Sequence, residues 1–148
     1  MNTSAWQKYM KILALFFIVL DAIFIVMFAL CAAGVFSTET SLMMLNADPE
    51  DVGTDVANVI AASLPLYAGM MIFGYAINLI CTYFVYRGAK NPAKMKPGMI
   101  LYGILSVLCA ITLVSNIVNG TFQLSVVSQC LITWIFFYGA LQINKLAK

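Results

Sequence analysis

The sequence predicts an all-α integral membrane protein, a four-transmembrane-helix bundle with cytoplasmic N and C termini. Of its 148 residues, 63% are hydrophobic and 9% are charged, and the mean hydropathy is +0.95, well outside the range of soluble domains. Four apolar stretches lie at about 12–36, 64–86, 99–118 and 124–143. Each approaches the roughly 20 residues that a helix needs to cross the hydrocarbon layer. Little chain remains for anything else, so we expect one domain over residues 1–148.

The charged residues predict how these stretches are threaded. All eight cations lie near the N-terminus, between the second and third stretches, or at the C-terminus, whereas five of the six acids follow the first stretch. Positively charged loops stay on the cytoplasmic side. We therefore expect both termini and an inner basic loop at 87–98 in the cytoplasm, and an acidic loop at 37–56 outside. The aromatic residues expected at the inner interface are Trp6, Tyr9, Tyr83, Tyr86, Tyr102 and Tyr138.

The first stretch is expected to remain as a membrane anchor. It follows Lys8 and Lys11 as a signal peptide would, but its apolar run is longer than a signal core and contains Asp21. The outer loop that follows has turn chemistry at Asp48-Pro49. Because its acids lack a regular ligand spacing such as D-x-D-x-D-G, a solvated, negatively charged face is favoured over a cation site.

The remaining elements follow in order. The second stretch is expected to begin as a helix before the membrane, at 56–63, with Pro65 bending it or marking its entry. The cations of the inner loop are interpreted as topology signals. The alternative is contact with anionic lipid head groups, at about 1 kcal/mol per cation, through Arg87, Lys90, Lys94 and Lys96. The third and fourth stretches meet at "NGT", residues 119–121, which matches a glycosylation acceptor but which we interpret as a turn.

Several kinds of chemistry are excluded by missing residues. The chain has no histidine, which removes a His-ligated haem, the usual zinc site and any Ser-His or Cys-His nucleophile. Its four cysteines are spread one per stretch without a C-x-x-C pair, so we interpret them as small apolar packing residues. We expect no enzyme activity, no metal, no cofactor and no nucleic-acid partner.

Asp21 is the residue that these considerations leave unexplained. An aspartate at mid-span costs about 2.5 to 3.5 kcal/mol, while each Leu, Ile, Phe or Val returns about 0.3 to 0.6 kcal/mol. The first stretch therefore inserts despite Asp21, and the carboxyl group becomes a functional-site hypothesis. No cation lies within any stretch. The partner of Asp21 is thus expected to be a polar group, a bound ion or a proton.

Counting residues along the helices predicts that partner. At a rise of 1.5 Å per residue, Asp21 and Asn78 fall at a similar depth. Helical phase places small and polar residues on one stripe of each later stretch, as at helix–helix interfaces in lipid. We therefore predict one polar layer, or ion site, formed by Asp21, Asn78, Tyr75, Ser106, Thr133 and Gln129.

Two functions fit this pattern. In the first, Asp21 is a neutral acid that holds the bundle together, because loss of hydration favours the uncharged form. The protein is then a small interaction or assembly subunit of the plasma (inner) membrane, with lipid, further copies of itself or another membrane protein as partners. In the alternative, Asp21 exchanges a proton or binds a cation in a small, oligomeric transporter or channel.

Overall fold

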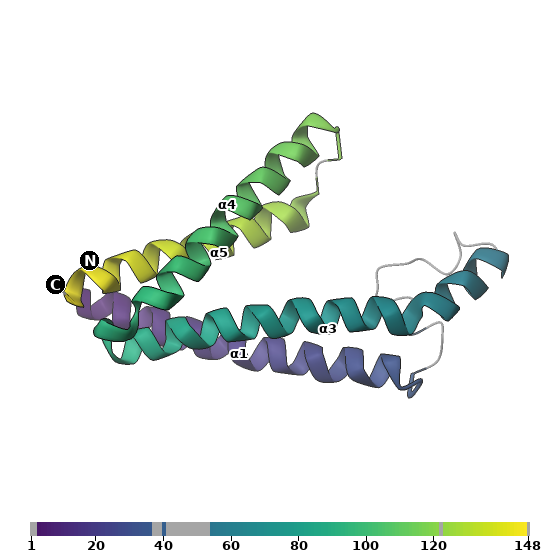
Figure 1. Ribbon diagram of the computed structural model, residues 1–148, viewed down its shortest axis with the longest axis horizontal. Helices are drawn as coiled ribbons and strands as arrows, with labels where there is room; N and C mark the ends of the chain where they lie inside the picture. The colour runs from purple at the N-terminus through teal and green to yellow at the C-terminus, as the bar shows by residue number, and fades with distance from the viewer. Residues whose placement is uncertain (1–2, 37–39, 41–53, 122, 148) are drawn as a thin grey trace. The chain divides into compact units, whose positions relative to one another are not determined.

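The computed structural model describes residues 3–36, 40, 54–121 and 123–147. In these residues the protein is all-α, with no strand. The described residues form four long helices, α1 (Thr3–Ala32), α3 (Thr54–Lys90), α4 (Lys96–Val118) and α5 (Leu124–Asn144) (Figure 1). The short 3-10 helix η1 (Pro92–Lys94) lies between α3 and α4, and a second one, η2 (Lys145–Ala147), follows α5. By length and composition all four are able to cross a membrane. The all-α prediction is confirmed at this level, whereas the Asp48-Pro49 turn and most of the acidic loop lie outside the described residues.

The first helix is longer at one end and shorter at the other than the apolar stretch at 12–36. It begins at Thr3, because the N-terminal residues Trp6 and Met10 pack against the rest of the fold. It ends at Ala32 because Gly34 adopts a positive φ of 70°. The Gly34 amide then donates to the Cys31 carbonyl and the Val35 amide to the Leu30 carbonyl, both at 3.1 Å, which is a Schellman cap.

The C-terminal end of α4 is formed in the same way as that of α1. Gly120, at a φ of 67°, follows α4, and the Thr121 amide donates to the Asn116 carbonyl at 2.9 Å. A side chain with a Cβ atom is strained in this conformation, so glycine suits the position. Residues 119–121 therefore form the turn that the sequence indicates.

The second apolar stretch is part of a much longer helix. α3 has 37 residues and contains Pro65, so it starts before the apolar stretch, as the sequence predicts. Proline cannot donate the helical hydrogen bond and crowds the preceding turn. Figure 1 shows the N-terminal part of α3 turning away from the axis of the rest of the helix.

The segment expected as an inner basic loop is mostly helical. α3 continues to Lys90, the Asn91 side chain accepts a hydrogen bond from the Ala93 amide at 3.2 Å, and η1 follows. Pro97 then stands in the first turn of α4, where its missing N–H is not needed. The Asx turn and the two prolines make this connection only a few residues long.

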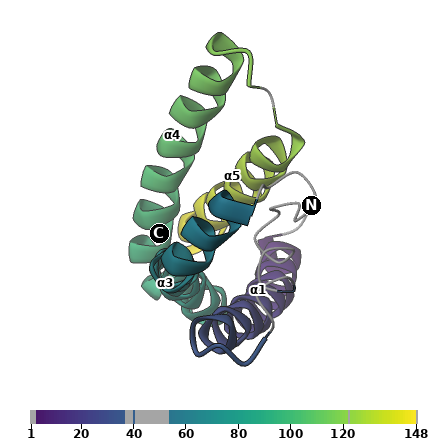
Figure 2. The ribbon, with the colours of Figure 1, turned by 90° about the vertical axis from the view of Figure 1, so that its right-hand side faces the viewer.

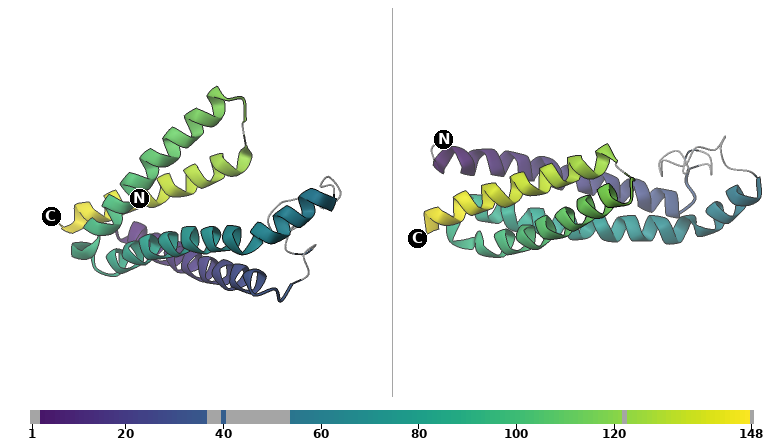
Figure 3. Two further views of the ribbon diagram at one scale, coloured as in Figure 1. Left: turned by 45° about the vertical axis from the view of Figure 1, so that its right-hand side comes forward. Right: turned by 90° about the horizontal axis from the view of Figure 1, so that it is seen from above.

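The chain forms two compact units, and α1 and α3 each run through both. The first unit comprises Val19–Leu79 and the second comprises Met1–Ile18 and Ile80–Lys148. In the first, the later part of α1 lies beside the earlier part of α3 in the views of Figures 1 and 2. In the second, α4 and α5 form an antiparallel pair (Figure 3).

The second unit has the better-defined core. The residues that make it are Met10, Ala14, Cys81, Val85, Ala89, Met95, Tyr102, Phe136, Ala140 and Ile143. Two glycines allow its helices to approach closely. A Cβ atom at position 98 would lie 3.0 Å from the Val85 backbone nitrogen, and one at position 103 would lie 3.1 Å from the Phe137 ring. The first turn of α4 is thus in backbone contact with α3.

We expect Gly98→Val to destabilise the protein by about 1–3 kcal/mol, because the backbone of α3 cannot move aside as a flexible side chain would. The measurement is the free energy of unfolding of the purified protein in detergent. Gly74→Val is the matched control, since nothing lies within 4 Å of a Cβ atom there. Equal losses in the two variants would contradict the close contact.

Candidate functional site

The Asp21 carboxyl group lies between α1 and α3 of the first unit. Its side chain is only 2% exposed, and the Asn78 side-chain nitrogen Nδ2 donates a hydrogen bond to Asp21 Oδ2 at 2.9 Å. The predicted pairing of these two residues is therefore present. Both stand on long apolar helices, where water is scarce and an unpaired polar group is costly.

Aromatic side chains form the surroundings of this pair. Tyr75 lies one helical turn before Asn78, and its ring stacks on Phe24 at a centroid distance of 5.0 Å and on Phe28 at 5.8 Å. Asp21, Phe24 and Phe28 follow one face of α1, three and four residues apart. The carboxyl–amide pair thus continues into an apolar stack that joins the same two helices.

The chemistry open to this site is narrow. Asp21 is the one acid whose side chain the structure describes, and the described residues contain no group of three potential metal ligands. A neutral Asp21 can both donate to and accept from a carboxamide, because an Asn side chain offers both kinds of group. An ionised Asp21 would have the Asn78 amide as its hydrogen-bond partner in place of a cation, and an amide stabilises a buried charge far less than a cation does.

A second buried polar pair lies in the other unit. The Thr82 hydroxyl Oγ1 and the Tyr102 hydroxyl are 2.7 Å apart, joining α3 to α4, and the Tyr102 ring stacks on Phe136 of α5 at 4.9 Å. Tyr102 is 2% exposed. The ring is thus packed among three helices and its hydroxyl group finds a partner inside the protein, while its expected depth near the membrane interface stays a prediction.

The other predicted members of the polar layer also lie in the second unit. The Ser106 hydroxyl donates to the Tyr102 carbonyl at 2.6 Å, and the Thr133 hydroxyl donates to the Gln129 carbonyl at 2.8 Å. Each of these hydroxyls is therefore satisfied within its own helix, and the Gln129 side chain is exposed. The structure brings Asp21, Tyr75 and Asn78 together, while a layer that also includes Ser106, Thr133 and Gln129 stays a prediction.

Two cysteines that the sequence suggests are separate come together between α4 and α5. Cys130 Sγ donates to the Cys109 carbonyl at 3.3 Å, and Cys109 Sγ donates to Thr133 Oγ1 at 3.7 Å. The Trp134 indole nitrogen also donates to the Ser106 carbonyl at 3.4 Å. No spacing along the chain signals these contacts, because they depend on how two helices align.

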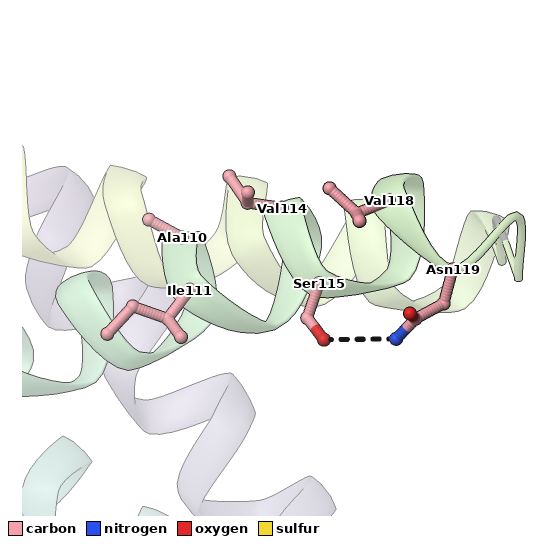
Figure 4. Close-up of a pocket in the computed structure, with 6 residues that line it drawn as sticks. All are labelled: Ala110, Ile111, Val114, Ser115, Val118 and Asn119. Carbon is pink, nitrogen blue, oxygen red and sulfur yellow. Dashed lines mark hydrogen bonds between the residues drawn. The ribbon is translucent and has the colours of Figure 1, made fainter.

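A shallow hollow lies along one side of α4 (Figure 4). Five of the six residues that line it come from α4 and the sixth directly follows this helix; they are Ala110, Ile111, Val114, Ser115, Val118 and Asn119. Its two polar side chains bond to each other, with Asn119 Nδ2 donating to Ser115 Oγ at 3.4 Å. The hollow is an apolar stretch of helix surface, and Asp21 is not part of it.

The chain matches no protein-family model, no curated protein and no solved structure. The geometry of its own residues is therefore the basis of any functional proposal.

We expect Thr82→Val and Tyr102→Phe each to cost about 0.5–1.5 kcal/mol of stability, and the double variant to cost less than their sum. Coupling arises because each single change removes the same hydrogen bond. Such bonds between membrane helices average about 0.6 kcal/mol. The measurement is a double-mutant cycle of unfolding free energies in detergent, with Thr112→Val, which bonds only within α4 among the described contacts, as the control for the Thr change. Additive losses would contradict a direct bond.

We expect Asn78→Leu to destabilise the protein by about 1–2 kcal/mol, because Asp21 would stay buried without its amide partner. The control is Asn116→Leu on α4, which makes the same chemical change where the described residues provide the side chain with no hydrogen bond. Both unfolding free energies are measured in the same detergent. If Asn116→Leu is as destabilising as Asn78→Leu, the loss comes from the leucine and the Asp21 contact contributes little.

Proposed function

We propose that the protein is an integral membrane protein with four spans, with both termini and the basic 87–98 segment in the cytoplasm, residing in the plasma (inner) membrane. Two observations support this placement. Large apolar side chains such as Ile23, Phe73, Val107 and Ile135 are exposed on all four helices, and fewer than a quarter of the residues in each apolar window are buried. The cations gather at the segments that the positive-inside rule retains in the cytoplasm.

Within that membrane, the proposed role is an interaction or assembly subunit. The observation that carries it is the direct Asn78–Asp21 hydrogen bond, in which the one acid of the four apolar stretches is occupied in joining α1 to α3. A carboxyl group used in this way acts as polar glue between membrane helices. It fixes how the two helices face each other and thereby which side chains they present outward.

The outward surfaces of these two helices suit a further partner. Gly69 of α3 is exposed with nothing within 4 Å of a Cβ atom, and Ala22 and Ala29 of α1 are exposed as well. Small residues on an exposed helix face allow another helix to pack closely in lipid. Self-association, or association with another membrane protein, is the activity that this surface supports.

One observation supports a second candidate, a proton- or cation-coupled transporter or channel. Asp21 is an ionisable group buried within an apolar helix pair, the position at which carboxyl groups of membrane proteins commonly act on protons or ions. In this proposal the Asn78 bond is the resting state, and Asp21 exchanges its proton or binds a cation when that bond opens.

The two proposals are separated by Asp21→Asn and Asp21→Leu in purified, liposome-reconstituted protein. An assembly role predicts that Asp21→Asn keeps the oligomeric state, because an amide can still bond to Asn78, while Asp21→Leu shifts it toward the monomer. It also predicts that the unmodified protein carries no proton flux above that of empty liposomes. Oligomeric state is measured by native mass spectrometry and flux by a pH-sensitive dye inside the vesicles.

The opposite pattern would overturn the assembly proposal. A flux that the unmodified protein supports and Asp21→Asn abolishes, with the oligomeric state unchanged, would establish exchange at Asp21. An unchanged oligomer in Asp21→Leu would remove the support that the Asp21–Asn78 bond gives to assembly. Thr112→Val, a substitution at an exposed position of α4, controls for effects of substitution, purification and reconstitution that do not involve Asp21.

A further inference from the structure

All the cations of the chain belong to the second unit, and no acid does. Residues 1–18 and 80–148 contain the eight Lys and Arg residues and neither Asp nor Glu. The seven cations that the structure describes are all exposed; they are Lys8, Lys11, Arg87, Lys90, Lys94, Lys96 and Lys145. This unit therefore has no carboxylate side chain of its own to neutralise them.

These cations come from three distant segments but gather at one end of the unit. η1 connects α3 to α4 and packs against η2 and α5, so the segment that contains Lys94 lies beside the segment that contains Lys145. The first turns of α1 lie beside the last turns of α5, because Trp6 contacts Tyr138 with ring centroids 5.4 Å apart. The start of α1 and the end of α5 appear together there in Figure 1. We name these seven residues the basic rim.

Aromatic side chains accompany the rim. The Lys90 ammonium group lies 4.5 Å from the centroid of the Tyr86 ring, and Tyr9 and Tyr138 are exposed. Tyrosine and tryptophan concentrate where the hydrocarbon meets the head groups. Large exposed apolar residues such as Ile12 and Leu15 follow directly along α1. The rim is thus at the level at which lipid phosphates would lie.

Helix ends add to the local potential. Arg87 and Lys90 stand in the last turn of α3, where they partly offset the negative end of the helix dipole. Lys96 instead begins α4, where the helix dipole is positive and the first amide groups lack helical partners. Lys145 stands at the C-terminal end of α5, where it too offsets the dipole, so Lys96 is the cation of the rim whose charge the helix dipoles compensate least.

We infer that the basic rim binds the head groups of anionic phospholipids. A cation that serves only as a topology signal acts while its own segment inserts, so it does not need to lie near the cations of other segments in the folded protein. Here cations from three segments lie on one surface that contains no acid and is flanked by aromatic residues. Such a surface can bind several phosphates of a lipid leaflet at once. The inference rests on the membrane placement proposed above but not on any role of Asp21.

The test uses the full-length protein in detergent, titrated with phosphatidylglycerol or with phosphatidylcholine of the same acyl chains. We expect the anionic lipid to raise the unfolding temperature and to be retained in native mass spectrometry, and the zwitterionic lipid to do neither. At about 1 kcal/mol per cation, each neutralised cation should weaken the apparent affinity roughly five-fold. Lys94→Gln, Lys96→Gln and Lys145→Gln together should weaken it on the order of 100-fold.

A charge-matched control separates the rim from overall charge. Thr121→Asp, Gln123→Glu and Ser125→Glu also change the net charge by three units, but at the exposed start of α5, where acids suit the helix dipole. This variant should bind phosphatidylglycerol as the unmodified protein does. Equal binding by the rim variant and the unmodified protein would overturn the inference.

Three further measurements use the unmodified protein. At 1 M salt, where the screening length is about 3 Å, the stabilisation by phosphatidylglycerol should largely disappear. Persistence of the full effect would show that the acyl chains, not the rim, are responsible. Equal stabilisation by soluble glycerophosphate would assign the rim to a free phosphate, and stronger stabilisation by a poly-glutamate peptide would assign it to an acidic protein. Either result would overturn lipid as the ligand.

Discussion

The scarcity of polar partners in an apolar chain is the constraint on which this structure depends. A backbone or side-chain polar group that leaves water for hydrocarbon must find a partner in the protein. Helices satisfy the backbone, but the side chains have to be matched across helices. The Asn78–Asp21 bond does this in one unit and the Thr82–Tyr102 bond in the other. Ser106 and Thr133 use the other solution, a bond to a carbonyl of their own helix.

These two solutions have different consequences for specificity. A hydroxyl bonded within its own helix leaves the helix free to rotate or slide against its neighbours. A carboxyl–amide bond between helices holds in only one alignment, and the stacked Tyr75, Phe24 and Phe28 rings favour that same alignment. The few polar residues between helices therefore fix register, while the many apolar residues provide a surface that fits lipid.

The sequence predicts what depends on residue type and on spacing within one helix. Hydropathy locates all four helices, Pro65 and the residues before it indicate an early start of α3, and depth along a helix pairs Asp21 with Asn78. The helix ends are predicted less accurately. Gly34 ends α1 before its apolar run ends, and the basic segment after α3 folds into η1 and the start of α4.

The features that could not be predicted from the sequence depend on packing between helices. The burial of Tyr102 has no signal in the sequence, because it depends on how α3 and α5 pack against α4. Cys109 and Cys130 lie on separate stretches without a shared motif, and only the alignment of α4 with α5 brings them together. The charges behave in the same way. Their order along the chain indicates a side of the membrane, but their convergence on one rim appears only when α1, η1 and η2 are placed together.

The connection between α3 and α4 restricts how the chain can vary in length. Met95 is fully buried against Gly88, and Gly98 touches the backbone of Val85, so the five residues from Asn91 to Met95 act as a spacer whose length is set by the packing on both sides. An added residue would displace Met95 and rotate α4 relative to α3. The exposed segment from Asn119 to Thr121 has no such anchor. Natural insertions and engineered tags should therefore accumulate between α4 and α5 and be rare between α3 and α4.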